Sequence, residues 1–214
     1  MPDLSRMRND YTAGRLSEED LAPTWVEQFD RWFGDVVAAE LPEPNAVVVA
    51  TADADGAPDA RVVLMKGYDE AGVIFGTSYS SAKGRSWPPT RAPHWSSPAR
   101  AAATGADDRT GGADRRHRVR RSVGPAAARA QLAAVASVQS TVVDSREELE
   151  ARLRLLDEQT AEGPVPRPDI WGGYRVLPER VEFWQGGKDR LHDRLRFVRD
   201  DEEGGGWMVQ RLAP

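Results

Sequence analysis

Cysteine is absent from this 214-residue chain, which excludes disulfides and thiol chemistry. Histidine is scarce, and His94, His117 and His192 do not have the spacing of metal ligands, so we expect no metal site. No apolar run is long enough to span a bilayer and no signal peptide opens the chain, so we expect a cytoplasmic protein with no membrane partner. The net charge of −5 gives no general reason to expect a nucleic-acid partner.

Between residues 86 and 130 the chain also lacks Leu, Ile, Phe, Tyr, Met, Glu and Lys. Nine arginines stand there against three aspartates, beside eleven alanines and five prolines. Such a segment has little apolar area to offset the entropy lost on ordering, so we expect it to be disordered, with few buried side chains. The run Arg115–Arg121 leaves open a second interpretation, a basic arm for nucleic acid.

The rest of the sequence has the patterns of an α+β domain. Thr24 and Glu27 have the spacing of a capping box before a helix that ends by Pro42, and Ser145 and Glu148 have it before a second helix. Short β-branched or alternating runs predict strands at 46–51, 60–66, 73–77, 171–176, 180–185, 194–199 and 207–212. Many short strands with two or three covering helices favour one antiparallel barrel domain over residues 1–214.

One stretch, Val181 to Arg194, concentrates the polar side chains. It begins as a strand, Gly186 and Gly187 break it, and lysine, aspartate, arginine and histidine follow. Arginine offers a planar fork of donors for phosphate or carboxylate, and histidine exchanges protons near neutral pH. The pattern alone is more typical of a charged hairpin end that faces water.

Three blocks in order, Phe-Trp-Gln-Gly at 183–186, Arg-Leu-His-Asp-Arg at 190–194 and Arg-Leu-Ala-Pro at 211–214, resemble the pyridoxamine 5'-phosphate oxidase family. The resemblance implies an FMN-binding split β-barrel and a homodimer with two FMN sites at the subunit interface. It also implies FMN-dependent oxidation of pyridoxamine or pyridoxine 5'-phosphate to pyridoxal 5'-phosphate, with oxygen as the acceptor.

The resemblance assigns roles to single residues as well. Arg190 and His192 would be catalytic and hold the substrate ring and its reacting substituent. Substrate contacts would also come from Lys66, from Leu191, and from Arg8 and Tyr11 in an N-terminal arm, residues 1–16, that we expect to be mobile. Gln139 and Ser140 would reach FMN from the partner subunit. The other residues expected to bind FMN are Arg61, Val62, Val63, Leu64, Met65, Lys66, Gly76, Thr77, Lys83, Trp184 and Arg194.

Departures from the family pattern limit the activity that we expect. Ala82 replaces the usual arginine before Lys83, and Gly76 replaces an aromatic residue, so FMN affinity is expected to be lowered. In the family a tyrosine, an arginine and a serine hold the substrate phosphate. The stretch from Ser122 to Ala130 has no tyrosine, Ala130 stands where the serine is expected, and Arg129 does not match the register of the arginine. We therefore expect a weak or inactive oxidase. The alternative is a non-catalytic FMN-binding protein or a defective gene product.

A shift of reading frame would explain the segment 86–130. A GC-rich coding of Ser86 to Ser97, read with one added G, gives Glu-Leu-Ala-Ala-Asn-Pro-Arg-Ala-Ala-Leu-Val-Phe, which resembles the next helix and strand of the family. A shifted coding of Gly105 to Arg118 also gives a strand that resembles the family. The family pattern resumes near Gln131. Sequencing of the coding DNA tests this hypothesis.

Overall fold

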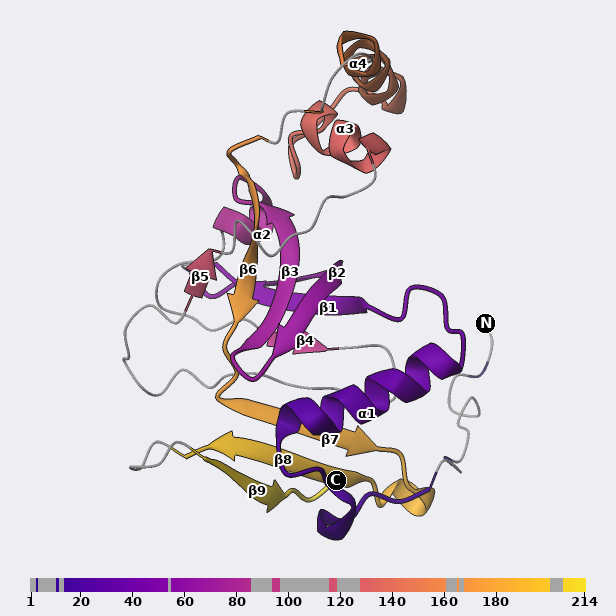
Figure 1. Ribbon diagram of the computed structural model, residues 1–214, viewed down its shortest axis with the longest axis vertical. Coiled ribbons are helices and arrows are strands. Elements are labelled where there is room, and N and C mark those ends of the chain that lie inside the picture. The colour runs from indigo at the N-terminus through magenta and orange to yellow at the C-terminus, as the bar shows by residue number, and fades with distance from the viewer. Residues whose placement is uncertain are drawn as a thin grey trace.

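The computed structural model describes residues 3, 11, 14–53, 55–85, 94–96, 116–118, 128–160, 165, 168–200 and 206–214. Its strands form two antiparallel sheets (Figure 1), one with six strands in the order β4-β1-β2-β3-β6-β5 and one with three in the order β7-β8-β9. The expected antiparallel sheets with few helices are confirmed. Among the described residues no ladder joins the two sheets into a closed ring.

The helices and strands lie close to where the sequence patterns place them. Thr24 and Glu27 form the expected capping box, in which Thr24 Oγ1 accepts from Glu27 N at 3.3 Å. The helical elements are η2 (Glu18–Asp20), α1 (Trp25–Ala38), α2 (Ala82–Arg85), α3 (Ala128–Ala136), α4 (Arg146–Gln159) and η3 (Lys188–Arg190). The strands are β1 (Ala46–Ala52), β2 (Pro58–Asp69), β3 (Gly72–Ser78), β4 (His94–Ser96), β5 (Arg116–Arg118), β6 (Trp171–Val176), β7 (Arg180–Gln185), β8 (Asp193–Arg199) and β9 (Trp207–Arg211).

Helix α1 packs between the two sheets and forms one core with both of them (Figure 1). Phe29 on its inner face meets Tyr68 of β2 edge-on, with ring centroids 4.8 Å apart. Trp32 meets Phe183 of β7 at 5.2 Å. Aromatic pairs at these distances contribute about 0.5–1.5 kcal/mol each beyond the apolar area that they bury. The helix thereby fixes the three-stranded sheet against the six-stranded one.

The three-stranded sheet presents two different faces because side chains alternate along each strand. Phe183 and Leu195 are fully buried on the face toward the core. Across the same strand pair, Glu182 lies opposite Arg196 and Trp184 opposite Arg194, which puts these polar and aromatic groups on the other face. The face away from the core therefore carries the side chains that can meet a ligand.

Helices α3 and α4 extend beyond the edge of the sheet where β3 ends and β6 begins (Figure 1). The indole Nε1 of Trp171, at the start of β6, donates to the carbonyl of Ala134 at 3.1 Å and attaches α3 to the sheet. Helix α4 has no buried residue. Since α3 is fixed in this place, the residues that follow it lie near the end of β3.

The segment 86–130 is described only in part. β4 and β5 are three residues each and pair with β1 and β6, and α3 begins at Ala128 within the segment. Residues 86–93, 97–115 and 119–127 lie outside the described residues, as does Arg8 of the N-terminal arm. The expectation of disorder across 86–130 therefore stays a prediction.

The described part of the chain has neither a membrane-spanning helix nor a cluster of metal-binding side chains. No helix there combines the length and the apolar character needed to cross a membrane. No group of three or more His, Cys, Asp or Glu side chains is placed to hold a metal ion in the same part of the chain.

Candidate active site

Strand β2 carries two of the expected site cations, Arg61 and Lys66, in different environments. The guanidinium of Arg61 donates to the carbonyl of Val49 at 3.1 Å and to Thr51 Oγ1 at 2.8 Å, and it pairs with Asp59. Lys66 is exposed and lies at the register shift between Met65 and Gly67, as the extra residue of a β-bulge. Bulges often redirect a side chain beside a functional site. In a regular strand the odd separation of Arg61 and Lys66 would put their side chains on opposite faces, and the bulge interrupts this alternation.

The end of β3 and the start of α2 gather hydrogen-bond donors around one oxygen. Thr77 Oγ1, the backbone N–H of Ser78 and Lys83 Nζ all donate to Oε1 of Gln139, at 3.2, 3.4 and 3.1 Å. Thr77, Ser78 and Lys83 are buried. Ser81, also buried, donates to the carbonyl of Ser78 at 2.7 Å and holds the turn that leads into α2.

This donor set fits a phosphate group. One neutral amide oxygen satisfies three donors, of which one carries a charge, and phosphate oxygens suit such a set better because charge-assisted hydrogen bonds are stronger. Burial, and then the nearby charge of Arg61, lower the pKa of Lys83, while Asp59 acts in the opposite direction. Both charge effects show that Arg61, Asp59 and Lys83 share one electrostatic environment.

Gln139 reaches these donors within its own chain, which differs from the expectation that it comes from a second subunit. The reason is the attachment of α3 to Trp171, which brings the residues after α3 to the end of β3. Ser140, next to Gln139, is exposed and adopts a positive φ of 68°. No partner is needed to bring Gln139 to Lys83.

The remaining residues expected to line FMN lie on β2 and β3 beside these donors. Val62 is exposed, Val63 and Leu64 are partly buried, and Met65 is buried. Gly76 is partly buried and pairs with Gly173 of β6. These positions offer a mostly apolar strand next to a polar turn, the combination that a flavin ring with a phosphate tail requires.

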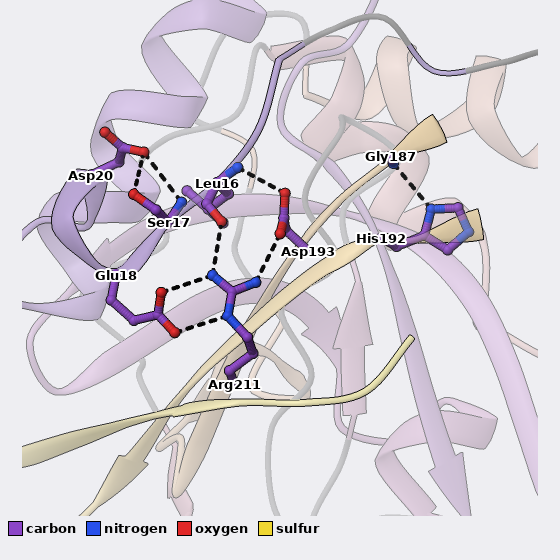
Figure 2. A network of polar contacts seen from close by, with 8 residues as sticks. All are labelled: Leu16, Ser17, Glu18, Asp20, Gly187, His192, Asp193 and Arg211. Atoms are coloured by element: carbon purple, nitrogen blue, oxygen red, sulfur yellow. Dashed lines mark hydrogen bonds and ion pairs between the residues drawn. The ribbon is translucent and has the colours of Figure 1, made fainter. Parts of the chain in front are cut away.

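A second group of expected residues gathers at the other sheet, around η3. The rings of Trp184 and His192 lie 4.7 Å apart. The backbone N–H of Gly187 donates to Nδ1 of His192 at 3.1 Å (Figure 2). Because Nδ1 accepts, the neutral imidazole carries its proton on Nε2, which can then donate to a ligand.

Tyr11 lies against this second group. Its ring meets Trp184 at 5.4 Å and His192 at 5.8 Å, both edge-on. A Cβ atom added at Gly186 would lie 2.3 Å from Cγ of Tyr11. The ring of Tyr11 can therefore take this position because residue 186 has no side chain. The described part of the N-terminal arm thus touches the site where the sequence placed it.

Arg190 and Leu191 stand on the exposed turn between Gly187 and His192. Asp189 and Arg190 both have positive φ, at 55° and 65°. Such backbone costs roughly 1–3 kcal/mol per residue and is concentrated at functional sites. A Cβ at Gly187 would lie 2.0 Å from the carbonyl oxygen of Leu191, so the turn also requires glycine there. The turn presents Arg190 to solvent near His192.

Arg194 is held by a residue that the sequence analysis did not single out. Glu182 accepts from Arg194 Nε at 2.7 Å and from Arg196 Nη2 at 3.1 Å. Burial alone would raise the pKa of Glu182, but hydrogen bonds from the two arginines lower it overall. The charged Glu182 orients Arg194 beside Trp184, its partner across the strand pair.

The expected site residues thus form two groups rather than one cleft within a chain. One group comprises Arg61, Thr77, Lys83 and Gln139 around the end of β3, and the other comprises Tyr11, Trp184, Arg190, His192 and Arg194 around η3. Figure 1 places α2 and the end of β7 at different ends of the sheets. Asp59 and Glu182 were not expected in the site, although Asp59 stands two residues before Arg61 on the same strand face, where the sequence could have indicated it.

Two family models match stretches of the chain that contain residues of both groups. Residues 33–87 match the family described as pyridoxamine 5'-phosphate oxidase, and residues 171–214 match the pyridoxine 5'-phosphate oxidase C-terminal dimerisation region. The first match ends at residue 87, close to where the composition changes. The second covers Trp184, Arg190, His192 and Arg194, and its description supports a homodimer.

Relatives match over the whole chain. A pyridoxine/pyridoxamine 5'-phosphate oxidase of Burkholderia multivorans is 44% identical over 220 residues, with 100% of both chains covered. One of Salinispora arenicola is 45% identical over 218 residues, covering 98% of this chain and 96% of the relative.

Solved structures agree on the architecture. PhzG from Burkholderia lata, in complex with tetrahydrophenazine-1-carboxylic acid, superimposes with a TM-score of 0.73 at 30% identity, covering 92% of this chain and 95% of PhzG. A pyridoxamine 5'-phosphate oxidase-related, FMN-binding protein of Nostoc punctiforme shares the fold, with a TM-score of 0.63 at 15% identity, covering 91% and 100% of the two chains. FMN is the cofactor, and the donors around Lys83 fit its phosphate. Whole-chain identity to the relatives and both family matches place the chain in the pyridoxine/pyridoxamine 5'-phosphate oxidase family.

Proposed function

We propose that this chain is an FMN-dependent oxidase of pyridoxamine 5'-phosphate and pyridoxine 5'-phosphate, with oxygen as the final acceptor. The observation that carries the proposal is the convergence of Thr77, Ser78 and Lys83 on one oxygen, together with the ring site of Trp184 and His192. The relatives named for this reaction support the substrate class.

The group around β3 holds the phosphate of FMN in this proposal. Lys83 and Arg61 supply positive charge, and Thr77 and the N–H of Ser78 supply neutral donors. Gln139 then turns its amide away from Lys83 and contacts the cofactor. Each charge-assisted hydrogen bond contributes about 1.5–3 kcal/mol, so Lys83 is the strongest single contact. When bound, FMN would supply the two-electron oxidation of the substrate carbon that bears the amine or hydroxyl; oxygen would take up the two electrons as hydrogen peroxide, and water would release ammonia from the amine substrate.

The group around η3 holds the substrate ring. His192 donates from Nε2 to the reacting substituent, because Gly187 occupies Nδ1. Arg190 lies on the same exposed turn and covers the ring from the other side, while Tyr11 shields the site from water. Lys66 at the bulge of β2 meets the substrate phosphate.

The two groups complete each other across a homodimer. Within one chain, α2 and the end of β7 are separated (Figure 1), and the C-terminal match to a dimerisation region supports pairing of two chains. In the dimer, the residues around the end of β3 in one subunit face the residues around η3 in its partner, so that two composite sites form. The two antiparallel sheets then belong to the split barrel that the family resemblance implies.

We propose that the oxidase activity of this chain is weak or lost, because the segment 86–130 lacks the residues that bind the substrate phosphate in the family. Of the residues that the family resemblance implies for binding the substrate phosphate, only Lys66 is present in this sequence. Loss of two or three charge-assisted hydrogen bonds costs on the order of 3–9 kcal/mol, or about two to six decades in affinity. An FMN-binding protein without turnover is the second candidate.

The proposal is tested by two measurements on the purified chain. Removal of flavin followed by titration with FMN reports cofactor binding through the quenching of flavin fluorescence. Oxygen uptake with pyridoxamine 5'-phosphate reports turnover. Binding together with slow uptake supports the oxidase, binding without any uptake favours the second candidate, and absence of FMN binding contradicts both.

A further inference from the structure

Asp193 is a buried carboxylate between two residues of the proposed site, His192 and Arg194. It is 6% exposed. Its Oδ2 accepts from the backbone N–H of Leu16 at 3.0 Å, and its Oδ1 accepts from Arg211 Nη1 at 2.8 Å (Figure 2). Burial alone would raise the pKa of Asp193, but these two hydrogen bonds lower it overall. The carboxylate is thus charged at neutral pH and uses both of its oxygens.

Arg211 of β9 extends the same network to the N-terminal segment. Its Nε and Nη2 donate to the two carboxylate oxygens of Glu18, both at 2.8 Å. Its Nη2 also donates to the carbonyl of Leu16 at 3.2 Å. Two parallel hydrogen bonds between a guanidinium and a carboxylate fix the relative orientation of the two groups as well as their distance. Arg211 therefore binds two carboxylates and one carbonyl at once.

The segment that Arg211 holds is itself a closed turn. Ser17 Oγ donates to Asp20 Oδ2 at 2.6 Å, and Ser17 N donates to the same oxygen at 3.2 Å. Leu16 is buried in the core. Residues 16–20, called segment 16–20 below, thus form a hydrogen-bonded turn, and Asp193 and Arg211 attach this segment to the three-stranded sheet.

Tyr11 lies five residues before segment 16–20. Its ring contacts the rings of Trp184 and His192 edge-on and lies against Gly186. The Asp193 carboxylate that anchors Leu16 follows His192 directly in the chain. Two consecutive residues, His192 just before β8 and Asp193 at its start, are therefore a ring-site residue and the anchor of the arm, and a shift of segment 16–20 changes how far Tyr11 reaches.

We propose that Asp193 and Arg211 are positioning residues, which hold residues 16–20 on the three-stranded sheet and thereby seat Tyr11 against the substrate ring site. The substrate role rests on the proposed function, whereas the holding role does not. Neither residue touches substrate or FMN in this proposal. Their loss weakens the binding of the pyridoxal ring and leaves the binding of FMN unchanged, because neither Tyr11 nor residues 16–20 are among those expected to bind FMN.

The test compares Arg211→Gln with Arg199→Gln in the full-length chain with excess FMN. Arg199 ends β8 on the same sheet but lies over the ring of Trp207, at 5.5 Å. We expect hydrogen exchange of residues 14–20 to be about tenfold faster in Arg211→Gln and unchanged in the control. Asp193→Asn, which still accepts from Leu16 but has no charge for Arg211, provides a second variant if Arg211→Gln fails to fold.

A second readout separates positioning from simple stability. By equilibrium dialysis, we expect the Kd of pyridoxal 5'-phosphate to rise about threefold or more in Arg211→Gln, while the Kd of FMN stays the same. Unchanged exchange at 14–20 would overturn the holding role. Faster exchange with both Kd values unchanged would overturn the positioning role. If the unsubstituted chain does not bind pyridoxal 5'-phosphate, the product of the proposed reaction, the substrate role given to Tyr11 fails, and the exchange rates still decide whether Arg211 holds segment 16–20.

Discussion

The Nζ of Lys83 lies 3.1 Å from Oε1 of Gln139, and this contact joins α2 to the segment that follows α3. Two residues 56 positions apart in the chain thus meet at the same oxygen as Thr77 and Ser78. Among the described residues, the hydrogen-bond partner of this buried ammonium is a neutral amide, and an anion in that place would bind it more strongly. The phosphate of FMN is the anion that the family supplies.

Lys83→Gln removes the charged donor and should weaken FMN binding. Loss of one charge-assisted hydrogen bond, about 1.5–3 kcal/mol, corresponds to roughly a ten- to hundredfold higher Kd. Fluorescence titration of flavin-free protein measures it. Lys188→Gln, which changes an exposed lysine of η3, is the matched control. Equal Kd values for the two variants would place the phosphate elsewhere.

Asp59→Asn should strengthen FMN binding. The Asp59 carboxylate pairs with Arg61 and shares an environment with Lys83, so it competes with a phosphate for both cations. An exposed ion pair is worth about 0.2–1 kcal/mol, which predicts up to about a fivefold lower Kd for FMN. Asp55→Asn in the nearby turn serves as the control. A higher Kd for Asp59→Asn would mean that Asp59 instead holds Arg61 in its binding position.

Gly186→Ala and Gly187→Ala should have different effects on stability. The new methyl group meets the Tyr11 side chain in the first variant and the backbone carbonyl of Leu191 in the second, at 2.3 and 2.0 Å. A side chain at the end of an arm can move aside, whereas a carbonyl within a turn cannot. Overpacking of this kind costs about 1–3 kcal/mol, which we expect in the free energy of unfolding for Gly187→Ala alone. Equal losses in urea denaturation would show that Tyr11 is as firmly fixed as the turn.

The attachment of residues 16–20 should survive mild acid and fail only in strong acid. Hydrogen bonds from Arg211 lower the pKa of Glu18 to about 2 from its usual 4.5, and the pKa of Asp193 is also lowered. A lowered pKa stabilises the folded state above the unfolded-state value, and this contribution is lost as the pH falls through the folded-state value. We expect exchange at 14–20, corrected for intrinsic rates, to be constant above pH 5 and to increase between about pH 4.5 and 2. Release between pH 5 and 7 would contradict this assignment.

Local patterns predicted most elements because they depend on neighbours in the sequence. Val47 and Val49 alternate with less buried residues and form β1, and Thr24 with Glu27 begins α1 as expected. Helix α3 was not predicted, since its alanine-rich run has no distinct apolar face. The bulge at Lys66 depends on the pairing of β2 with β3 and leaves no signature within β2 itself.

The site was predictable where motifs carry it and hidden where tertiary contacts build it. Trp184 and His192 lie together because one short turn joins their strands. Arg211 and Glu18, by contrast, are separated by 193 residues, and nothing near either one indicates the other. Gln139 was expected to act across the dimer, and only the packing of α3 on Trp171 shows that it reaches Lys83 in its own chain.

The most direct test of the whole account is the formation of pyridoxal 5'-phosphate from pyridoxamine 5'-phosphate under oxygen, with FMN in excess. It compares the chain as given with a version whose residues 86–130 are restored to the shifted reading frame. We predict slow or undetectable turnover for the first and turnover for the second at least about a hundredfold higher in kcat/KM, from the restored phosphate contacts. Equal kcat/KM values would contradict the role given to the segment, and absence of turnover in both FMN-loaded proteins would contradict the proposed oxidase.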